Sequence, residues 1–259
     1  MSHLAGKRIL ITRPRQQAGA LARLLTELGA QPVISPAITI APLEDTMALD
    51  QVLGRLGEYD WVVFTSANGV AAVWERLGAL NKDSEAFAAM QVAAIGPATA
   101  GALNSHGVKA DFVPPEYVAE AIAEGLGEVT GRRILLLRAD IAREALAQIL
   151  DQRGALVDNV PVYRTLLAQP DAETLAELER GIDIVTLTSA STVRGFLQLV
   201  EGRNWPWLEH VMFACIGPIT AAELRANGRT AHIVAEEYTT GGLIRALQAY
   251  IEPSEARER

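Results

Sequence analysis

The sequence contains one cysteine and few aromatic residues, and both scarcities narrow the possible folds. The single cysteine, Cys215, excludes an internal disulfide, and its place after Phe213 and Ala214 in an apolar run predicts a small buried side chain. Aromatic residues make up 5% of the chain, so the core must be built from Ala, Leu, Val and Ile. This composition favours α/β layers over a β-sandwich.

Several functional signatures are also missing. The four histidines are scattered without ligand-like spacing, so we expect no metal site. Neither a G-x-x-x-x-G-K-[ST] nor a G-x-G-x-x-G motif is present, which disfavours a nucleotide site. The net charge of −8 argues against nucleic acid as a partner. No apolar run approaches the roughly 20 residues of a membrane span. Charged residues from Lys7 to Arg15 also interrupt the N-terminal apolar stretch, so we expect a cytoplasmic protein.

An internal repeat is the strongest positive signal, and 259 residues leave room for two modest domains. Four of the matched pairs are Gly6–Ile11 with Gly131–Leu136, Thr65–Val70 with Thr188–Val193, Ala94–Ala100 with Cys215–Ala221, and Glu116–Tyr117 with Glu237–Tyr238. These matches and Gly29-Ala30 with Gly154-Ala155 are collinear, and their offset drifts only from 125 to 121 residues. The sequence therefore predicts two copies of one fold.

Within each copy, short β-rich runs alternate with helical periodicity. In the first copy we expect strands at 8–12, 32–35, 61–64, 92–95 and 111–113. Helices are expected at 16–28, after a cap at Asn68, from Pro97 and from Val118. This alternation predicts an α/β fold with a doubly wound parallel sheet of about five strands in each copy.

One segment breaks the rhythm at the same place in both copies. Residues 36–42 alternate in character between two prolines, as in an exposed or edge strand, and 161–167 are their counterpart. The two segments could pair as a ladder joining two lobes, with the chain exchanged between lobes, or each copy could form its own lobe. Tyr163 in the second copy corresponds to Ile38 in the first. Tyr163 is either an edge-strand packing residue or a neutral proton donor, with an ordinary pKa of about 10.

Ligands of open α/β sheets bind beyond the carboxyl ends of the strands, where helix N-termini offer free N–H groups to anions. The repeated polar motifs lie at such predicted strand ends. The candidate substrate-binding residues are Arg13, Arg15, Thr65, Ser66, Ala67, Asn68, Gly96, Thr99, Arg138, Ser189, Ala190, Ser191, Gly217 and Thr220. The alternatives are helix capping for the hydroxyl and amide residues, turn geometry for the glycines, and solvated surface charge for the arginines.

These residues carry a family resemblance along nearly the whole chain. The chain resembles the uroporphyrinogen-III synthases in Ile11–Pro14, Phe64–Val70, Ala94–Ala100, Val162–Thr165, Thr188–Ser191 and Ile216–Thr220. The resemblance implies two flavodoxin-like lobes, residues 1–38 plus 166–259 and residues 43–160, joined by a β-ladder of 39–42 and 161–165. It also implies a monomer that needs no cofactor.

The activity that the resemblance implies is that of a cyclising lyase of porphyrin and heme biosynthesis. Its substrate would be hydroxymethylbilane, a linear tetrapyrrole with eight carboxylates, which loses its hydroxyl group and closes with inversion of ring D to uroporphyrinogen III. The resemblance points to Tyr163 as the catalytic residue. The alternatives are a two-lobed protein that binds a small anion without chemistry and a two-domain glycosyltransferase, and the missing nucleotide signatures disfavour the latter.

Overall fold

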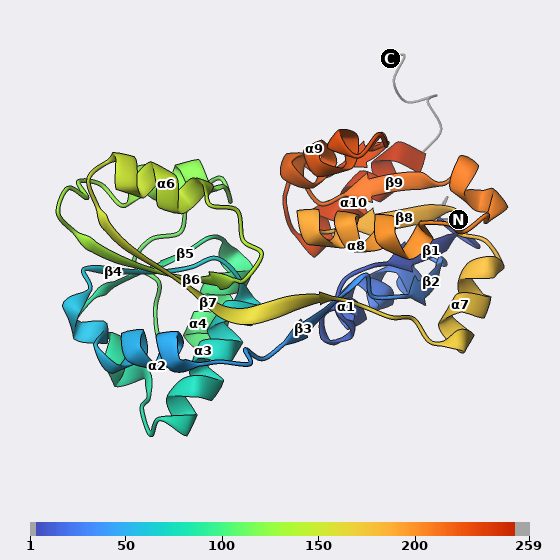
Figure 1. Cartoon of the computed structure of the whole chain (residues 1–259). Coiled ribbons are helices and arrows are strands. Elements are labelled where there is room, and N and C mark those ends of the chain that lie inside the picture. The colour runs from blue at the N-terminus through green and yellow to red at the C-terminus, as the bar shows by residue number, and fades with distance from the viewer. Residues whose placement is uncertain (1–3, 252–259) are drawn as a thin grey trace, which may run out of the picture. The chain divides into compact units, whose positions relative to one another are not determined.

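The computed structural model describes residues 4–251, which form ten α-helices and two five-stranded sheets (Figure 1). The backbone contacts divide the chain into two units. Unit 1 runs up to Thr39 and resumes at Leu166, and unit 2 is Ile40–Thr165. No helix among the described residues has the length and apolarity needed to cross a membrane.

Unit 1 contains a parallel sheet in the order β10-β9-β8-β1-β2. Its strands are β1 (Arg8–Ile11), β2 (Gln31–Ile34), β8 (Ile184–Leu187), β9 (Met212–Cys215) and β10 (Ile233–Val234). Its helices are α1 (Arg15–Glu27), α7 (Ala172–Glu179), α8 (Ala190–Val200), α9 (Pro218–Ala226) and α10 (Thr240–Ile251). The order corresponds to 2-1-3-4-5 within the unit, which is the flavodoxin-like arrangement.

Unit 2 contains a sheet in the order β3-β7-β6-β4-β5. Its strands are β3 (Ile38–Ala41), β4 (Trp61–Phe64), β5 (Gln91–Ala94), β6 (Arg133–Ala139) and β7 (Leu156–Leu167). Its helices are α2 (Met47–Gly54), α3 (Ala67–Ala79), α4 (Pro97–Ser105), α5 (Ala119–Gly125) and α6 (Ala145–Gln152). Strands β4, β5, β6 and β7 pair in parallel, and both unit boundaries fall inside the neighbouring strands β3 and β7.

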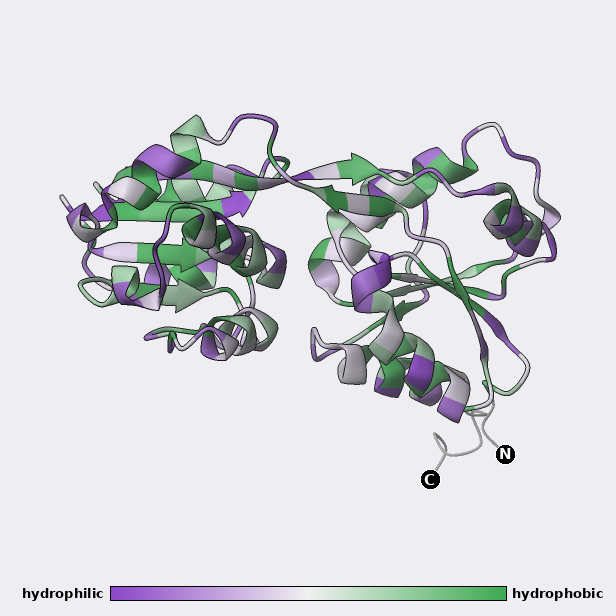
Figure 2. Cartoon of the chain, turned by 90° about the horizontal axis from the view of Figure 1, so that it is seen from below, coloured by the Kyte–Doolittle hydropathy of each residue, from purple (hydrophilic) through white to green (hydrophobic). Residues whose placement is uncertain are grey.

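Each sheet is covered on both faces, because consecutive residues of its inner strands are apolar and point alternately to the two faces. In unit 1, Ile9 and Ile11 of β1 pack against α1 and α10, whereas Leu10 packs with α7, α8 and α9. In unit 2, Phe64 of β4 faces α2, α3 and α4, whereas Val63 faces α5 and α6. In Figure 2 the inner strands are coloured mostly as hydrophobic. The continuous apolar runs therefore mark strands buried on both sides, as predicted.

The two sheets share a strand order. An isolated parallel bridge joins Phe112 to Ala93 of β5. The strand order Phe112-β5-β4-β6-β7 in unit 2 therefore corresponds to the order β10-β9-β8-β1-β2 in unit 1. Residues 111–113 thus contribute a bridge instead of the predicted strand. Asn68 is not the helix cap: Ser66 has the extended backbone of an N-cap, and its hydroxyl accepts the Gly69 N–H, so Asn68 lies inside the first turn of α3.

Other local predictions are closer to the structure. Strand β4 has the predicted bounds, and α4 begins at Pro97 as predicted. Cys215 is fully buried, and this burial raises the pKa of its thiol to about 12, as for an inert core side chain. Segment 36–42 forms edge strand β3, but its counterpart is only the end of the twelve-residue strand β7.

Candidate active site

The predicted site residues of unit 2 follow strands β4 and β6, which are neighbours in the sheet. Phe64 of β4 lies opposite Leu137 of β6, so the two strands end at the same edge. In a 2-1-3-4-5 sheet this pair of strands forms the switch point beyond which ligands bind. Ser66 follows β4 at this edge, and Arg138 is the penultimate residue of β6.

Ser66 connects the start of helix α3 with Tyr163. Its Oγ accepts a hydrogen bond from the Gly69 N–H at 2.9 Å and lies 3.1 Å from the Tyr163 hydroxyl. The absence of a side chain at Gly69 gives the Ser66 Oγ room beside the Gly69 backbone, because a Cβ at that position would lie 3.3 Å from this oxygen. The phenol is therefore held at the N-terminus of α3, where backbone N–H groups favour developing negative charge.

A β-bulge sets the direction of the Tyr163 side chain. Arg138 of β6 lies opposite Pro161 of β7, but the next residue, Ala139, lies opposite Tyr163, so Val162 is the extra residue. In a regular strand, Val162 and Tyr163 would face opposite sides of the sheet. Both instead pack into the core on the α2–α3–α4 side. The bulge thus turns Tyr163 toward Ser66.

Tyr163 keeps its proton throughout the physiological pH range. The side chain is 7% exposed, and this burial raises the pKa of its phenol above 10, while hydrogen bonds with Ser66 and Asn68 act in the opposite direction. Burial thus holds the group neutral, and the two hydrogen bonds would stabilise the phenolate left after proton transfer. This chemistry suits a proton donor for a leaving hydroxyl.

The Gly-Pro motifs after β5 and β9 form equivalent helix starts. Gly96 and Gly217 are the N-caps of α4 and α9, each followed by proline at the first helical position. A Cβ on Gly96 would lie 3.1 Å from the ring of Tyr117, and one on Gly217 would lie 2.8 Å from the ring of Tyr238. Each glycine therefore leaves room for a tyrosine ring over the helix start.

Thr99 and Thr220 occupy the third helical position of α4 and α9, and both are buried. Sequence reasoning did not assign Tyr117 and Tyr238 to the site. The signal was available, because the Glu-Tyr pairs share with the Gly-Pro motifs the same offset of 121 residues.

In unit 1 the candidate residues follow β1 and β8, which are also neighbours at the switch point. Ser189 caps α8, with its Oγ accepting the Thr192 N–H at 3.1 Å, and the Thr192 side chain completes a capping box. The Ser191 hydroxyl lies 2.8 Å from that of Ser189. Arg13 donates from Nη1 to the Thr240 Oγ1 at 3.1 Å. Thr240 is a contact that the sequence motifs did not indicate.

The remaining candidates occupy simple positions. Thr65 lies between β4 and Ser66, the N-cap of α3. Ala67 and Asn68 begin α3, and Ala190 begins α8. Asn68 reaches the phenol of Tyr163 by a hydrogen bond. Among the predicted site residues of unit 2, the structure brings Tyr163 into hydrogen-bonding contact with Ser66 and Asn68.

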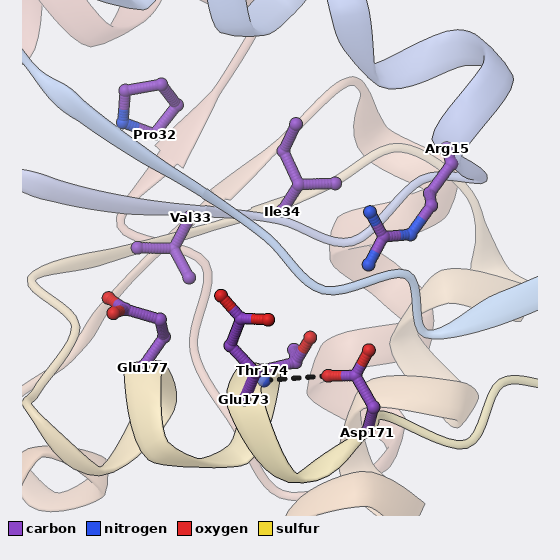
Figure 3. Close-up of a pocket in the computed structure, with 8 residues that line it drawn as sticks. All are labelled: Arg15, Pro32, Val33, Ile34, Asp171, Glu173, Thr174 and Glu177. Atoms are coloured by element: carbon purple, nitrogen blue, oxygen red, sulfur yellow. Dashed lines mark hydrogen bonds between the residues drawn. The ribbon is translucent and has the colours of Figure 1, made fainter.

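Arg15 lies elsewhere in unit 1. It is exposed at the start of α1 and lines a cavity of about 300 Å³ between β2 and α7 (Figure 3). Three carboxylates, of Asp171, Glu173 and Glu177, line the same cavity. The pKa of Asp171 is lowered by its hydrogen bonds to Thr174 and further by Arg15. A cavity with three carboxylates and one guanidinium suits a polyanion poorly, so substrate contact by Arg15 stays a prediction without support from its surroundings.

Among the described residues, no group of three or more His, Cys, Asp or Glu side chains is placed to hold a metal ion. The chemical resources of the two switch points are therefore hydroxyl groups, a neutral phenol, guanidinium groups and the N–H groups of helix starts. Such groups bind carboxylates and supply protons.

Comparison with known proteins gives a consistent assignment. A family model described as uroporphyrinogen-III synthase HemD matches residues 19–245. The uroporphyrinogen-III synthase of Synechococcus elongatus is 34% identical over 95% of this chain and 96% of its own length. A putative uroporphyrinogen-III synthase of Methanothermobacter thermautotrophicus is 32% identical over 92% of this chain and 96% of its own.

Solved structures show the same fold. A mutant uroporphyrinogen III synthase from Thermus thermophilus matches with a TM-score of 0.66 and 21% identity, over 95% of this chain and 99% of its own. Uroporphyrinogen-III synthetase from Helicobacter pylori matches with a TM-score of 0.61 and 20% identity, over 94% of this chain and 99% of its own. With the family model and the relatives that cover nearly the full length, the chain belongs to the uroporphyrinogen-III synthase family.

Proposed function

We propose that this protein converts hydroxymethylbilane to uroporphyrinogen III, by loss of water and ring closure with inversion of ring D. The observation that carries the proposal is the family match across residues 19–245, together with a 34% identical synthase that aligns over nearly the full length of both chains. The proposal includes a cytoplasmic monomer that acts without a cofactor.

In the proposed first step, Tyr163 assists departure of the substrate hydroxyl group by donating its phenolic proton. The C–O bond breaks, water leaves, and the electron pair of the pyrrole forms an azafulvene cation. The bulge in β7 and the Ser66 hydroxyl support this role, because they hold a neutral phenol at a helix start. Asn68 and Ser66 are placed to stabilise the phenolate until it regains a proton.

In the second step, the substituted carbon of ring D attacks the azafulvene, and the spiro intermediate rearranges to the inverted macrocycle. This outcome depends on how the flexible chain is folded before attack. Positioning of this kind contributes up to roughly 7–11 kcal/mol in favourable cases. We assign it to the helix starts of α3, α4, α8 and α9, whose N–H groups suit carboxylates. Thr65, Ala67, Thr99, Ala190, Ser191 and Thr220 belong to these starts.

The proposal also includes a finer architecture, in which an internal duplication gave two flavodoxin-like lobes. These lobes would be residues 1–38 plus 166–259 and residues 43–160, with 39–42 and 161–165 as the connecting β-ladder. The shared strand order supports this reading, because β1, β2, β8 and β9 occupy the places that β6, β7, β4 and β5 occupy in unit 2. The position of edge strand β3 next to β7 supports the ladder.

The test is incubation of the purified protein with freshly prepared hydroxymethylbilane, followed by oxidation and chromatographic separation of the isomers. Type III product formed faster than the spontaneous reaction is expected. Type I product at the spontaneous rate, in a sample shown by circular dichroism to be folded, would refute the activity. Tight binding of the bilane without type III product would identify a binding protein instead.

A further inference from the structure

Two arginines occupy equivalent places in the two units. Arg13 follows β1 and Arg138 is the penultimate residue of β6. They lie 125 residues apart in the sequence, and each stands beside the switch point of its own sheet. Sequence alone gives them the same role. Their surroundings in the structure differ in charge, exposure and hydrogen bonding.

Arg138 is enclosed and its charge is balanced. Its guanidinium donates from Nε to the Asn159 Oδ1 at 2.9 Å and from Nη1 to the Arg143 carbonyl oxygen at 2.7 Å. Its Nη2 pairs with the Glu144 carboxylate at 3.3 Å, and the side chain is 4% exposed. A ligand could reach this group only if the unit opened around it, so these contacts give Arg138 a structural role.

Arg13 lacks this compensation. Burial lowers the pKa of its guanidinium, and within residues 4–251 no carboxylate lies within 4.0 Å of it. Its Nε is buried without a hydrogen-bond partner, and the side chain as a whole is only partly buried. A partly buried cation without a counter-charge is costly, and this cost falls when an anion binds.

Thr240 completes the arrangement. Its Oγ1 accepts the hydrogen bond from Arg13 Nη1, and a hydroxyl that accepts still has one hydrogen of its own to donate. Thr240 is also the first residue of the twelve-residue helix α10. A guanidinium and a hydroxyl can both donate charge-assisted hydrogen bonds to carboxylate oxygens.

We propose that Arg13 and Thr240 form a carboxylate-binding subsite in unit 1, and that the equivalent Arg138 of unit 2 binds no substrate. The inference rests on the proposed function, because hydroxymethylbilane supplies the carboxylates. It gives the two similar units unequal affinity for carboxylates.

The experiment compares wild-type protein with Arg13→Gln, Thr240→Val and, as a matched surface control on the same unit, Arg23→Gln. Arg23 lies on α1 with its side chain 75% exposed. For Arg13→Gln we expect the KM for hydroxymethylbilane to rise about tenfold, the change typical of one lost charge-assisted contact, with a smaller change in kcat. Thr240→Val should raise KM less, and Arg23→Gln should leave both constants unchanged.

Two further readouts separate binding from structure. The Tm of ligand-free Arg13→Gln should equal or exceed that of wild type, because an uncompensated buried charge is removed, whereas Arg138→Gln should lower the Tm. Affinity for uroporphyrin III, a stable octacarboxylate, should fall about tenfold in Arg13→Gln. An unchanged KM and uroporphyrin affinity, or a Tm lowered as in Arg138→Gln, would overturn the inference.

The same measurements distinguish this inference from the proposed function. If wild-type protein makes no type III product yet binds uroporphyrin more tightly than Arg13→Gln does, the activity is refuted and the subsite stands. If wild-type protein makes type III product and Arg13→Gln does so with the same KM, the subsite is refuted and the activity stands. If wild-type protein neither reacts nor binds uroporphyrin, both are refuted.

Discussion

Replacement of Tyr163 by phenylalanine removes one oxygen atom from the candidate active site. The ring packs in the unit 2 core beside Val162, and these contacts remain in Tyr163→Phe. The hydrogen bonds of the phenol with the Ser66 Oγ, 3.1 Å long, and with Asn68 are lost. Ser66 still accepts the Gly69 N–H, so α3 keeps its cap. The change therefore isolates the proton donor from the fold around it.

The expected magnitudes differ for stability and for rate. Each neutral hydrogen bond contributes a net of about 0.5–1.5 kcal/mol, so loss of the two bonds should lower the free energy of unfolding by about 1–3 kcal/mol. Proton transfer by a positioned side chain contributes about 10²–10⁴ in rate. Because positioning by other groups carries much of the reaction, we expect kcat to fall by about 10², or about 2.7 kcal/mol.

One assay follows formation of type III product in quenched time points, with the spontaneous type I reaction subtracted. A second assay measures the affinity for uroporphyrin III by fluorescence quenching. The kcat of Tyr163→Phe should fall far more than its affinity for uroporphyrin III. Tyr250→Phe, on a side chain that is 47% exposed on α10, is the matched control and should change neither. Equal losses of rate and affinity would assign Tyr163 to binding, and an unchanged kcat would remove it from the mechanism.

Two further predictions concern stability. Gly217→Ala places a Cβ 2.8 Å from the ring of Tyr238 and should lower the free energy of urea unfolding by about 1–3 kcal/mol. The control Gly19→Ala, in open space on α1, should not lower it. Equal effects of the two substitutions would show that Tyr238 moves aside freely. Burial, and then the hydrogen bond to Asp158, raise the pKa of Tyr59 to about 12. Because this folded-state pKa exceeds the unfolded value of about 10, its stabilisation is complete below pH 10 and lost as the pH rises toward 12. The free energy of urea unfolding should fall less steeply between pH 10 and 12 in Tyr59→Phe than in wild type. Parallel curves for the two proteins would contradict the raised pKa of Tyr59.

The sheets could be predicted because their signals are local. Four consecutive apolar residues between polar neighbours mark β4, and Pro97 marks the start of α4, so both agree with the structure. The cap of α3 is a different case. Thr65, Ser66 and Asn68 are all able to cap, and helical periodicity does not choose between them. The choice of Ser66 depends on its extended backbone, which the fold imposes.

The site could be predicted only in outline, because its details depend on residues distant in sequence. Arg13 and Arg138 share a position relative to their strands, but only Arg138 has a carboxylate partner, supplied by Glu144. The repeat predicts equal roles for the two arginines, and side chains outside the repeated motifs make them unequal. Likewise, the contact of Tyr238 with Gly217 joins residues separated by α9 and β10, and the local pattern does not determine it.

The location of Tyr163 depends on the strand register that the bulge in β7 sets, more than on the identity of the bulged side chain, Val162. Many apolar replacements of Val162 would leave the phenol where it is. If Ala139 instead lay opposite Val162, in a regular ladder with no residue removed, strand alternation would carry the hydroxyl of Tyr163 to the opposite surface of the sheet, toward α5 and α6. Evolution of this segment would therefore tolerate substitution of Val162 as long as the bulge is preserved.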